Sequence, residues 1–408
     1  MSNTHSAADI DYLLSPQAIR DRTAEVFALA EAGKTHFSVH LDQLPATCDF
    51  VMEVIQDNYP DLEIPFHSRW GHFKVGGIDR LEAFKARLSD LDPLEQARAK
   101  LDLVVTSVLL DAGAGAQWKY SETHGGETHN FNRSEGLAVA SYHMFLAGAF
   151  SSNPDNPLQA DAKGLQNLSE ADIETGFQVS ESNPLVGVAG RTRLLQALGE
   201  AVAQNPQYFP KGRVGSLVDY LIATHGRSFE VKDILRAVLD ALGSIWPGRV
   251  QIDGVNLGDV WPYHPADSDI DTLVPFHKLS QWLTYSMVEP MWDAGLEVTG
   301  AEKLTGLAEY RNGGLFLDMG VIALRDPELM KQKHLPSSEL IIEWRALTLQ
   351  LLDRMGALVQ ERLGKSPAEF PLAKVLEGGT WWAGRRIAQK LREDGSTPLQ
   401  LDSDGTVF

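Results

Sequence analysis

Residues 337–362 read SSELIIEWRALTLQLLDRMGALVQER, and they carry the clearest secondary-structure signal in the chain. Large apolar residues recur there every three or four positions, which is the spacing of one face of an α-helix. We therefore predict a long helix that packs along this stripe. The stripe consists of Leu340, Trp344, Leu347, Leu351, Met355 and Leu358.

Helical signals recur along most of the chain. Two of the expected helices begin with an N-cap residue followed by a proline, which suits the first helical position. They begin at Ser15-Pro16, with an end near Ala32, and at Asp92-Pro93. Further helices are expected to begin at Ser134, near Leu185, near Val214, and at a capping box from Ser366 to Glu369.

Strand signals are sparse and short. Residues 36–41 alternate between polar and apolar side chains, and residues 250–252 and 315–317 are weaker candidates. The sequence shows neither a regular alternation of strands and helices nor an internal repeat. We therefore predict a mainly α fold with a few short strands. Residues 1–408 are expected to form a single α-rich catalytic domain, undivided or in two lobes.

Composition disfavours several classes of protein. Hydrophobic residues make up 43% of the 408 residues, which is enough for a sizeable packed core. The formal net charge of −19 disfavours binding to nucleic acid or to anionic membranes. Cys48 is the only cysteine, so neither a disulfide framework nor a cysteine zinc cluster is expected. Residues 1–16 lack the basic and apolar regions of a signal peptide, and no apolar run approaches the length of a membrane span, so a cytoplasmic location is expected.

The segment from Leu273 to Gly320 is the most informative for function. Its first part reads LVPFHKLSQWLTYSMVEP and is expected to be helical, and its second part reads LTGLAEYRNGGLFLDMG. Lys278 and Glu309 stand there among apolar residues, where an unpaired charge costs free energy. His277 and Gln281 are polar neighbours of Lys278 at helical spacing. The two charges form either a structural ion pair or a functional site, and the pattern favours a site.

Two other constellations are candidate ligand sites. The first lies at the expected helix start Arg133–Glu135, where backbone N–H groups favour anions, and Trp118 and Tyr120 precede it. An ordinary helix cap is the favoured explanation there, and phosphate or sugar binding is the alternative. The second is HSRWGHF, residues 67–73. It is either a polar clamp on a ligand or a buried turn in which Arg69 pairs with a carboxylate.

Metal and cofactor binding are not expected. His124, Glu127 and His129 share a loop, but they lack the spacing of a zinc motif and an obvious third ligand. Residues 261–265, WPYHP, follow Asp259 and are expected to be a packed aromatic loop. These segments therefore do not point to a metal centre.

Long and unusual strings are spread over nearly the whole chain. Besides the 273–320 segment they are HSRWGHF (67–73), LLDAGAG (109–115), WKYSE (118–122), RSEGLAVASYHMF (133–145), NPLVGVAGR (183–191), LEGGTW (376–381) and SDGTVF (403–408). On these strings the chain resembles the uracil catabolism protein 4 family. Lys278-x-x-Gln281 and Glu309-Tyr310-Arg311 are also similar, more distantly, to motifs of the queuosine-5′-monophosphate salvage N-glycosidases, which carry Asp-Tyr-Arg.

The resemblances imply a fold and a reaction. The fold would be an α-helical, DNA-glycosylase-like body, and the reaction would belong to uracil breakdown through a ribosylated intermediate. It would cleave the N-glycosidic bond of ribosylurea 5-phosphate, a small phosphorylated ribosyl substrate, to give urea and ribose 5-phosphate. That reaction requires no metal and no cofactor.

The resemblances also imply roles for residues. Glu309 would stabilise or attack the oxocarbenium-like state at the anomeric carbon. Lys278 would protonate the leaving urea or bind the phosphate, and Arg311 would orient Glu309 or hold a sugar hydroxyl. The expected substrate-binding residues are Trp118, Tyr120, Arg133, Glu135, His67, Arg69, Arg191, His277, Gln281, Tyr310 and Asp318.

Two alternatives belong to other classes of protein. One is a hydrolase of amide or ureido C–N bonds in the same pathway, which ammonia or carboxylate products would reveal. The other is a non-catalytic partner of pathway enzymes, in which Lys278 and Glu309 form a structural pair.

Overall fold

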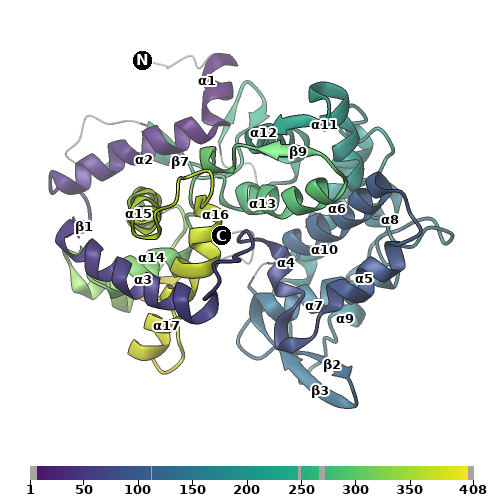
Figure 1. Cartoon of the computed structure of the whole chain (residues 1–408), viewed down its shortest axis with the longest axis horizontal. Helices are drawn as coiled ribbons and strands as arrows, with labels where there is room; N and C mark the ends of the chain where they lie inside the picture. Colours follow the sequence, from purple (N-terminus) through teal and green to yellow (C-terminus); the bar gives the residue numbers. More distant parts are fainter. Residues whose placement is uncertain (1–6, 112, 247–249, 266–271, 403–408) are drawn as a thin grey trace. The chain divides into compact units, whose positions relative to one another are not determined.

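The computed structural model describes residues 7–111, 113–246, 250–265 and 272–402 (Figure 1). The string SDGTVF and Ala112 of LLDAGAG lie outside these ranges. The fold is mainly α-helical with short two-stranded pairings, so the predicted fold class is confirmed. Within the described ranges, no helix has both the length and the apolar character that a membrane span requires.

The chain divides into two compact units, each assembled from separated segments. The first comprises Met1–His67, Gly248–Gln281 and Gly300–Ser403, and the second comprises the rest of the chain. Helix α13 (Lys278–Asp293) begins in the first unit and continues in the second.

The first unit holds the N-terminal and C-terminal helices. Its elements are α1 (Ala7–Leu13), α2 (Pro16–Glu31), β1 (Phe37–Val39), η1 (Leu41–Gln43), α3 (Leu44–Asn58), β5 (Gln251–Ile252), β6 (Val255–Asn256), β7 (Val260–Tyr263), β8 (Thr272–Pro275), η5 (Ala301–Lys303), α14 (Tyr310–Asp318), β10 (Ile322–Leu324), η6 (Pro327–Lys331), β11 (Lys333–His334), α15 (Glu339–Leu363), α16 (Leu372–Val375), the π-helical turn η7 (Leu376–Thr380), α17 (Trp381–Leu391) and β12 (Gln400–Leu401).

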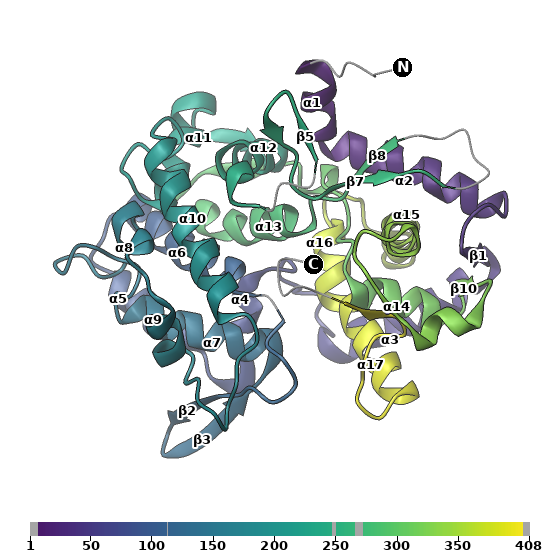
Figure 2. The same ribbon diagram turned by 180° about the vertical axis from the view of Figure 1, so that it is seen from behind.

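Helix α15 is the centre of the first unit. It is seen end-on in Figures 1 and 2, with α2 and α14 on opposite sides, and α3 and α16 also pack against it. The predicted stripe is buried except for its last member, Leu358, which is half-buried. Glu343 and Arg345, which lie off the stripe, are buried as well. Burial on more than one face explains why this helix also carries buried ion pairs.

The strands of the first unit form isolated pairs. β1 pairs with β10 and places Phe37 opposite Leu324, β5 pairs with β6, and β7 pairs with β8, all antiparallel. β11 and β12 form a short parallel pair. These pairs fasten connecting segments to the helical core and do not build a sheet layer.

The second unit has a different central helix. Its elements are α4 (Arg69–His72), η2 (Val75–Gly77), α5 (Arg80–Leu88), α6 (Pro93–Leu109), β2 (Tyr120–His124), β3 (Glu127–Phe131), α7 (Arg133–Leu146), α8 (Ala162–Gln166), α9 (Glu170–Gly176), α10 (Val188–Gln204), η3 (Val214–Ser216), α11 (Leu217–His225), β4 (Ser228–Glu230), α12 (Val231–Leu242), η4 (Gly243–Ile245) and β9 (Glu297–Thr299). Residues 97–109 of α6 are all buried, and α7, α10 and η3 pack around them. β2 pairs with β3 in a hairpin, and β4 pairs with β9 in parallel.

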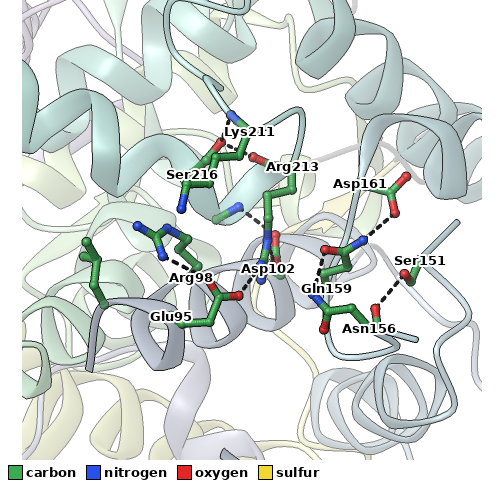
Figure 3. A network of polar contacts seen from close by, with 12 residues as sticks. Glu95, Arg98, Asp102, Ser151, Asn156, Gln159, Asp161, Lys211, Arg213 and Ser216 are labelled. Atoms are coloured by element: carbon green, nitrogen blue, oxygen red, sulfur yellow. Dashed lines mark hydrogen bonds and ion pairs between the residues drawn. The ribbon is translucent and has the colours of Figure 1, made fainter. Parts of the chain in front are cut away.

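A buried ionic network fastens α6 to η3 (Figure 3). Arg213 bonds through Nε to Asp102 at 2.7 Å and also pairs with Glu95, while the backbone N–H of Gly215 donates to Asp102 at 2.6 Å. Burial acts to lower the pKa of Arg213, but the two carboxylates outweigh it and raise that pKa. The charges therefore compensate one another inside the second unit.

Most of the predicted helix starts agree with the structure, and some assignments were wrong. Ser15 and Asp92 are the N-caps of α2 and α6, as predicted. The residues near 185 enter a helix only at Val188. Residues 315–317, expected as a strand, lie inside α14. The Ser366–Glu369 hydrogen bonds form, but they close a turn, and the next helix begins at Leu372.

The contact between α14 and α17 depends on a glycine. A Cβ on Gly384 would lie 2.2 Å from the carbonyl oxygen of Arg311, a backbone atom with little freedom to move. We therefore expect Gly384→Ala to lower the free energy of unfolding by about 1–3 kcal/mol in urea denaturation. Gly190→Ala in α10 is the matched control, since among the described residues no atom outside its chain neighbours and its own helix backbone lies within 4 Å of the added methyl. This control should stabilise by roughly 0.5–1 kcal/mol, and equal losses in both variants would contradict the packing argument.

Candidate functional site

Glu309 is the N-cap of α14, and the start of the helix holds its carboxylate. The backbone N–H of Arg311 donates to Oε2 at 2.6 Å, and that of Asn312 donates to Oε1 at 2.5 Å. Because the first N–H groups of a helix have no partner within it, they suit an anion. The carboxylate of Glu309 is therefore held in one orientation.

Positive charges surround Glu309. Burial raises the pKa of Glu309 above its ordinary value. The two backbone N–H groups oppose this rise, and so do the charges of His67 and Lys278. The sequence singled out Lys278 and Glu309 as charged residues in apolar surroundings. In the folded chain the charge of Lys278 acts on Glu309. We call Glu309, Lys278, His67 and Glu377 the Glu309 cluster.

A buried ion pair positions the helix starts that carry Lys278 and Glu309. Arg345 binds both carboxylate oxygens of Asp259, at 2.9 and 2.8 Å, and its guanidinium lies 4.1 Å from the ring centre of Phe276. Asp259 also accepts from the backbone N–H of Lys278 at 2.9 Å. Arg345 Nε donates to the carbonyl of Ala308, the residue before Glu309, at 3.3 Å. The same pair therefore orders the start of α13 and the approach to α14.

Gln281 connects the two parts of the 273–320 segment. Its side-chain oxygen accepts from the backbone N–H of Thr305 at 3.1 Å and from the Thr305 hydroxyl at 2.9 Å. Its amide nitrogen donates to the carbonyl of Phe276 at 3.1 Å. Gln281 is fully buried, so in this structure its role is to position the segment that leads to Glu309.

His67 belongs to the cluster through a carboxylate on the π-helical turn. Its Nδ1 lies 2.8 Å from Oε2 of Glu377, and its backbone N–H donates to the carbonyl of Ala373 at 2.9 Å. The hydroxyl of Tyr59 donates to the other oxygen of Glu377 at 3.2 Å. Single π-helical turns often occur at functional sites because they reorient side chains within a helix. Here the turn carries Glu377.

Three further residues predicted to belong to the site, Tyr310, Arg311 and Asp318, lie within α14. Tyr310 stacks on Trp344, with ring centres 5.3 Å apart. Arg311 donates through Nη1 to the carbonyl of Gly395 at 2.7 Å, and its backbone N–H bonds Glu309. Asp318, one of the expected substrate-binding residues, has a nearly buried side chain that pairs with Arg392.

His277 is not within α13 but immediately before it. Its φ of +47° lies in the left-handed region, which is strained for a residue with a side chain. Its Nε2–H donates to the carbonyl of Leu13 at 2.8 Å, and burial lowers its pKa, which favours the neutral ring. In this structure His277 attaches the end of α1 to the turn that positions Lys278.

Other predicted residues form a separate cluster in the second unit. Arg69 is fully buried, donates to the Ser107 hydroxyl at 2.7 Å and to the Ser134 hydroxyl at 3.1 Å, and pairs with Asp111 at 3.1 Å. Burial acts to raise the pKa of Asp111, but Arg69 outweighs it and the pKa is lowered. Of the two interpretations of HSRWGHF, the structure supports the buried turn for Arg69. Glu135 is half-buried and its charge acts on Arg69.

The remaining predicted residues of the second unit differ in exposure. Arg191 donates to the carbonyls of Leu110, Val186 and Gly113, and it is buried. Trp118 is fully buried with its indole N–H bonded to Phe177, and Tyr120 stacks on His143. Arg133 is exposed at the start of α7 with a φ of +52°. Arg69 thus connects α6 to α7, and Arg191 binds backbone carbonyls of the connecting segments near the end of α6 and the start of α10.

Sequence reasoning missed several residues of the first unit. Glu377 stands alone among Leu376, two glycines and Trp381, which is the same signal that singled out Lys278 and Glu309. Asn312 is fully buried, and within the described residues neither atom of its amide has a hydrogen-bond partner. A buried polar group without a partner calls for an explanation, and ligand binding is one.

The fold and the Glu309 cluster define the class of protein. It is a mainly α-helical chain in which the fixed carboxylate of Glu309 interacts with the charges of Lys278 and His67, and His67 is bound to the carboxylate of Glu377. The chain belongs to the family described as Protein of unknown function (DUF1688), whose model matches residues 12–408. It is 43% identical over 411 residues to Protein urg3 of Schizosaccharomyces pombe, covering 99% of this chain and 100% of the relative.

A second relative connects the family to a pathway by name. The chain is 39% identical over 437 residues to Uracil catabolism protein 4 of Lachancea kluyveri, covering 98% of this chain and 99% of that protein. The resemblance to the uracil catabolism protein 4 family, which rested on sequence strings alone, is therefore confirmed.

Proposed function

We propose that the chain takes part in uracil catabolism as an N-glycosidase that hydrolyses ribosylurea 5-phosphate to urea and ribose 5-phosphate. The observation that carries the proposal is the Glu309 carboxylate. It is fixed by two backbone N–H groups and accompanied by the charges of Lys278 and His67. Cleavage of an N-glycosidic bond builds positive charge at the anomeric carbon, and a fixed carboxylate stabilises such charge without reorganising.

The hydrogen bonds to Glu309 support a role as an anion. Two N–H donors favour its ionised form against the effect of burial, so the group is suited to stabilise or attack the cation. Whether it acts as a nucleophile or as a base for water is left to the stereochemistry of the product. Lys278 has two candidate roles, as a phosphate ligand or as the proton donor to urea.

Asn312 fits the same substrate class. A carboxamide both donates and accepts hydrogen bonds, and so does a ureido group, so the two can pair at two points. Leaving such an amide without a partner in the fold costs about 1–3 kcal/mol. A protein can retain such a loss of stability when the unpartnered amide is needed to bind a ligand.

Replacement of Asn312 by leucine should therefore raise stability and lower activity. We expect Asn312→Leu to increase the free energy of unfolding by about 1–3 kcal/mol, because it removes the unpartnered amide. Asn183→Leu is the matched control: that amide bonds to Lys119 and Gln178, so the same change should destabilise. Urea denaturation and turnover assays on both variants check this, and a destabilised Asn312→Leu would refute it.

The direct test uses purified protein and ribosylurea 5-phosphate. Release of urea is followed by ammonia after addition of urease, and release of ribose 5-phosphate by its reducing end. The proposal predicts both products in equal amounts. Ammonia without urease, or a carboxylate product, would instead indicate a C–N hydrolase. Absence of turnover by folded protein would reject the glycosidase and leave the non-catalytic partner.

The role of Lys278 is tested with the substrate that lacks the phosphate. If Lys278 binds phosphate, Lys278→Met raises KM for ribosylurea 5-phosphate and leaves the weaker reaction of ribosylurea unchanged. If Lys278 donates a proton, the variant lowers kcat for both substrates.

A further inference from the structure

His67 and Glu377 form a nearly buried pair, and the charge of His67 acts on Glu309. Only 7% of the His67 side chain and 14% of the Glu377 side chain are exposed, and Nδ1 lies 2.8 Å from Oε2. The backbone of His67 is fixed to Ala373, and its ring lies 5.8 Å from the ring of Trp381. A carboxylate on one imidazole nitrogen orients the ring, and the other ring nitrogen is then the one that can transfer a proton.

Tyr59 fixes the carboxylate in turn. Its hydroxyl donates to Oε1 of Glu377 at 3.2 Å, so each carboxylate oxygen has one partner of this triad. Burial, and then the neighbouring Glu377, raise the pKa of Tyr59, which keeps the phenol protonated as a donor. The orientation of His67 is thus set by groups that do not themselves need to change protonation.

We propose that His67 is the general acid that protonates the leaving urea nitrogen, and that Glu377 is its positioning residue. The inference rests on the N-glycosidase function proposed above. The C1′–N bond breaks, its electron pair stays on nitrogen, and the Nε2 proton of the imidazolium joins that nitrogen to give urea. Water adds its oxygen to C1′, and the proton it releases restores the imidazolium, through Glu309 if that carboxylate is the base for water. The balance is ribosylurea 5-phosphate plus water giving ribose 5-phosphate plus urea.

The choice of His67 over Lys278 follows from acid strength. An imidazolium is a stronger acid than an ammonium group and exchanges protons near neutral pH. Urea is a poor leaving group as an anion, so its departure needs a proton from a donor of this strength. This assignment leaves Lys278 for the phosphate.

The first unit contains a matched triad outside the Glu309 cluster. Nδ1 of His36 lies 2.9 Å from Oε2 of Glu343, and the hydroxyl of Tyr263 donates to Oε1 of Glu343 at 3.0 Å. It has the same three residue types in the same order of contacts, with a His36 side chain that is 40% exposed. His36→Gln therefore removes a contact of the same kind without touching the proposed chemistry.

The test compares two leaving groups. Ribosylurea 5-phosphate needs a proton to release urea, whereas 4-nitrophenyl riboside 5-phosphate releases nitrophenolate without one. We expect His67→Gln to lower kcat on the urea substrate by about 10²–10³-fold and on the nitrophenyl substrate by less than about 10-fold. Glu377→Gln should show the same selectivity more weakly, with partial recovery in Glu377→Asp. His36→Gln should match the wild type on both substrates.

Each outcome decides between structural and chemical roles. If His67→Gln loses both substrates equally, the pair is structural and the inference is wrong. If His67→Gln retains full activity on the urea substrate, His67 is not the acid. Residual nitrophenyl cleavage shows that a variant is folded. A wild type that cleaves neither substrate would refute the proposed function itself. A wild type that cleaves both substrates, together with a His67→Gln variant that also cleaves both at the wild-type rate, would refute only the role of His67.

Discussion

Glu309→Gln should lower kcat by roughly 10³-fold, while two opposed effects act on its stability at neutral pH. The loss of activity is expected because the amide carries no charge to oppose the cation at the anomeric carbon. Removal of the charge favours the variant, because burial raises the pKa of Glu309 and ionisation costs more in the fold than in the unfolded chain. The carboxamide opposes this gain, because it has one acceptor oxygen for the two N–H groups of Arg311 and Asn312. Steady-state kinetics and urea denaturation of the same preparations measure both effects.

The pH dependence of stability has a definite sign. Since the folded pKa of Glu309 is raised, the wild type gains stability relative to Glu309→Gln as pH falls through that pKa and loses this gain as pH rises through it. Glu309→Asp is the second control, because it keeps the charge and shortens the side chain by one methylene. It should retain more activity than Glu309→Gln. Equal kcat in wild type and Glu309→Gln would exclude a catalytic role.

Asp259→Ala should be the most destabilising of the substitutions considered, with a loss of about 3–5 kcal/mol. It leaves the buried guanidinium of Arg345 without its carboxylate and removes the acceptor for the indole N–H of Trp261, at 2.7 Å, and for the backbone N–H of Lys278. Activity should fall as well, because the starts of α13 and α14 lose their common anchor. Urea denaturation gives the free energy of unfolding.

Two controls separate the cost of a buried unpaired charge from the loss of an ordinary surface ion pair. The double variant Asp259→Ala/Arg345→Met should recover part of the loss, because it no longer buries an unpaired charge. Glu328→Ala breaks the exposed Lys331–Glu328 pair, whose side chains are 71% and 67% exposed, and should change stability by less than about 1 kcal/mol. A similar loss for Asp259→Ala and Glu328→Ala would show that the buried network contributes little.

The fold could be predicted wherever local chemistry decides it. Ser15 and Asp92 cap the helices that follow them, and the apolar stripe of α15 lies in the core except at Leu358. The error at residues 315–317 has a local cause: three apolar residues suit a short strand as well as a buried helix. The cap at Glu309, six positions earlier, decides for the helix.

The site could be predicted only in part. Lys278 and Glu309 are lone charges in apolar sequence, and such a signal can be found without the fold. The contact between His67 and Glu377 joins residues 310 positions apart, so spacing could not pair them. Arg69 shows the opposite case, because its residue type suggests anion binding while folding places it against Ser107, Ser134 and Asp111.

Because Glu309 caps α14, the backbone amides at the start of this helix report the chemical state of the Glu309 carboxylate. The amide protons of Arg311 and Asn312 point at the two oxygens of one carboxylate. Any event that changes the charge on those oxygens, whether protonation or formation of a glycosyl ester, weakens the two hydrogen bonds together. The nitrogen and proton chemical shifts of these two amides would therefore follow the state of Glu309 through a reaction cycle, with no label on the substrate.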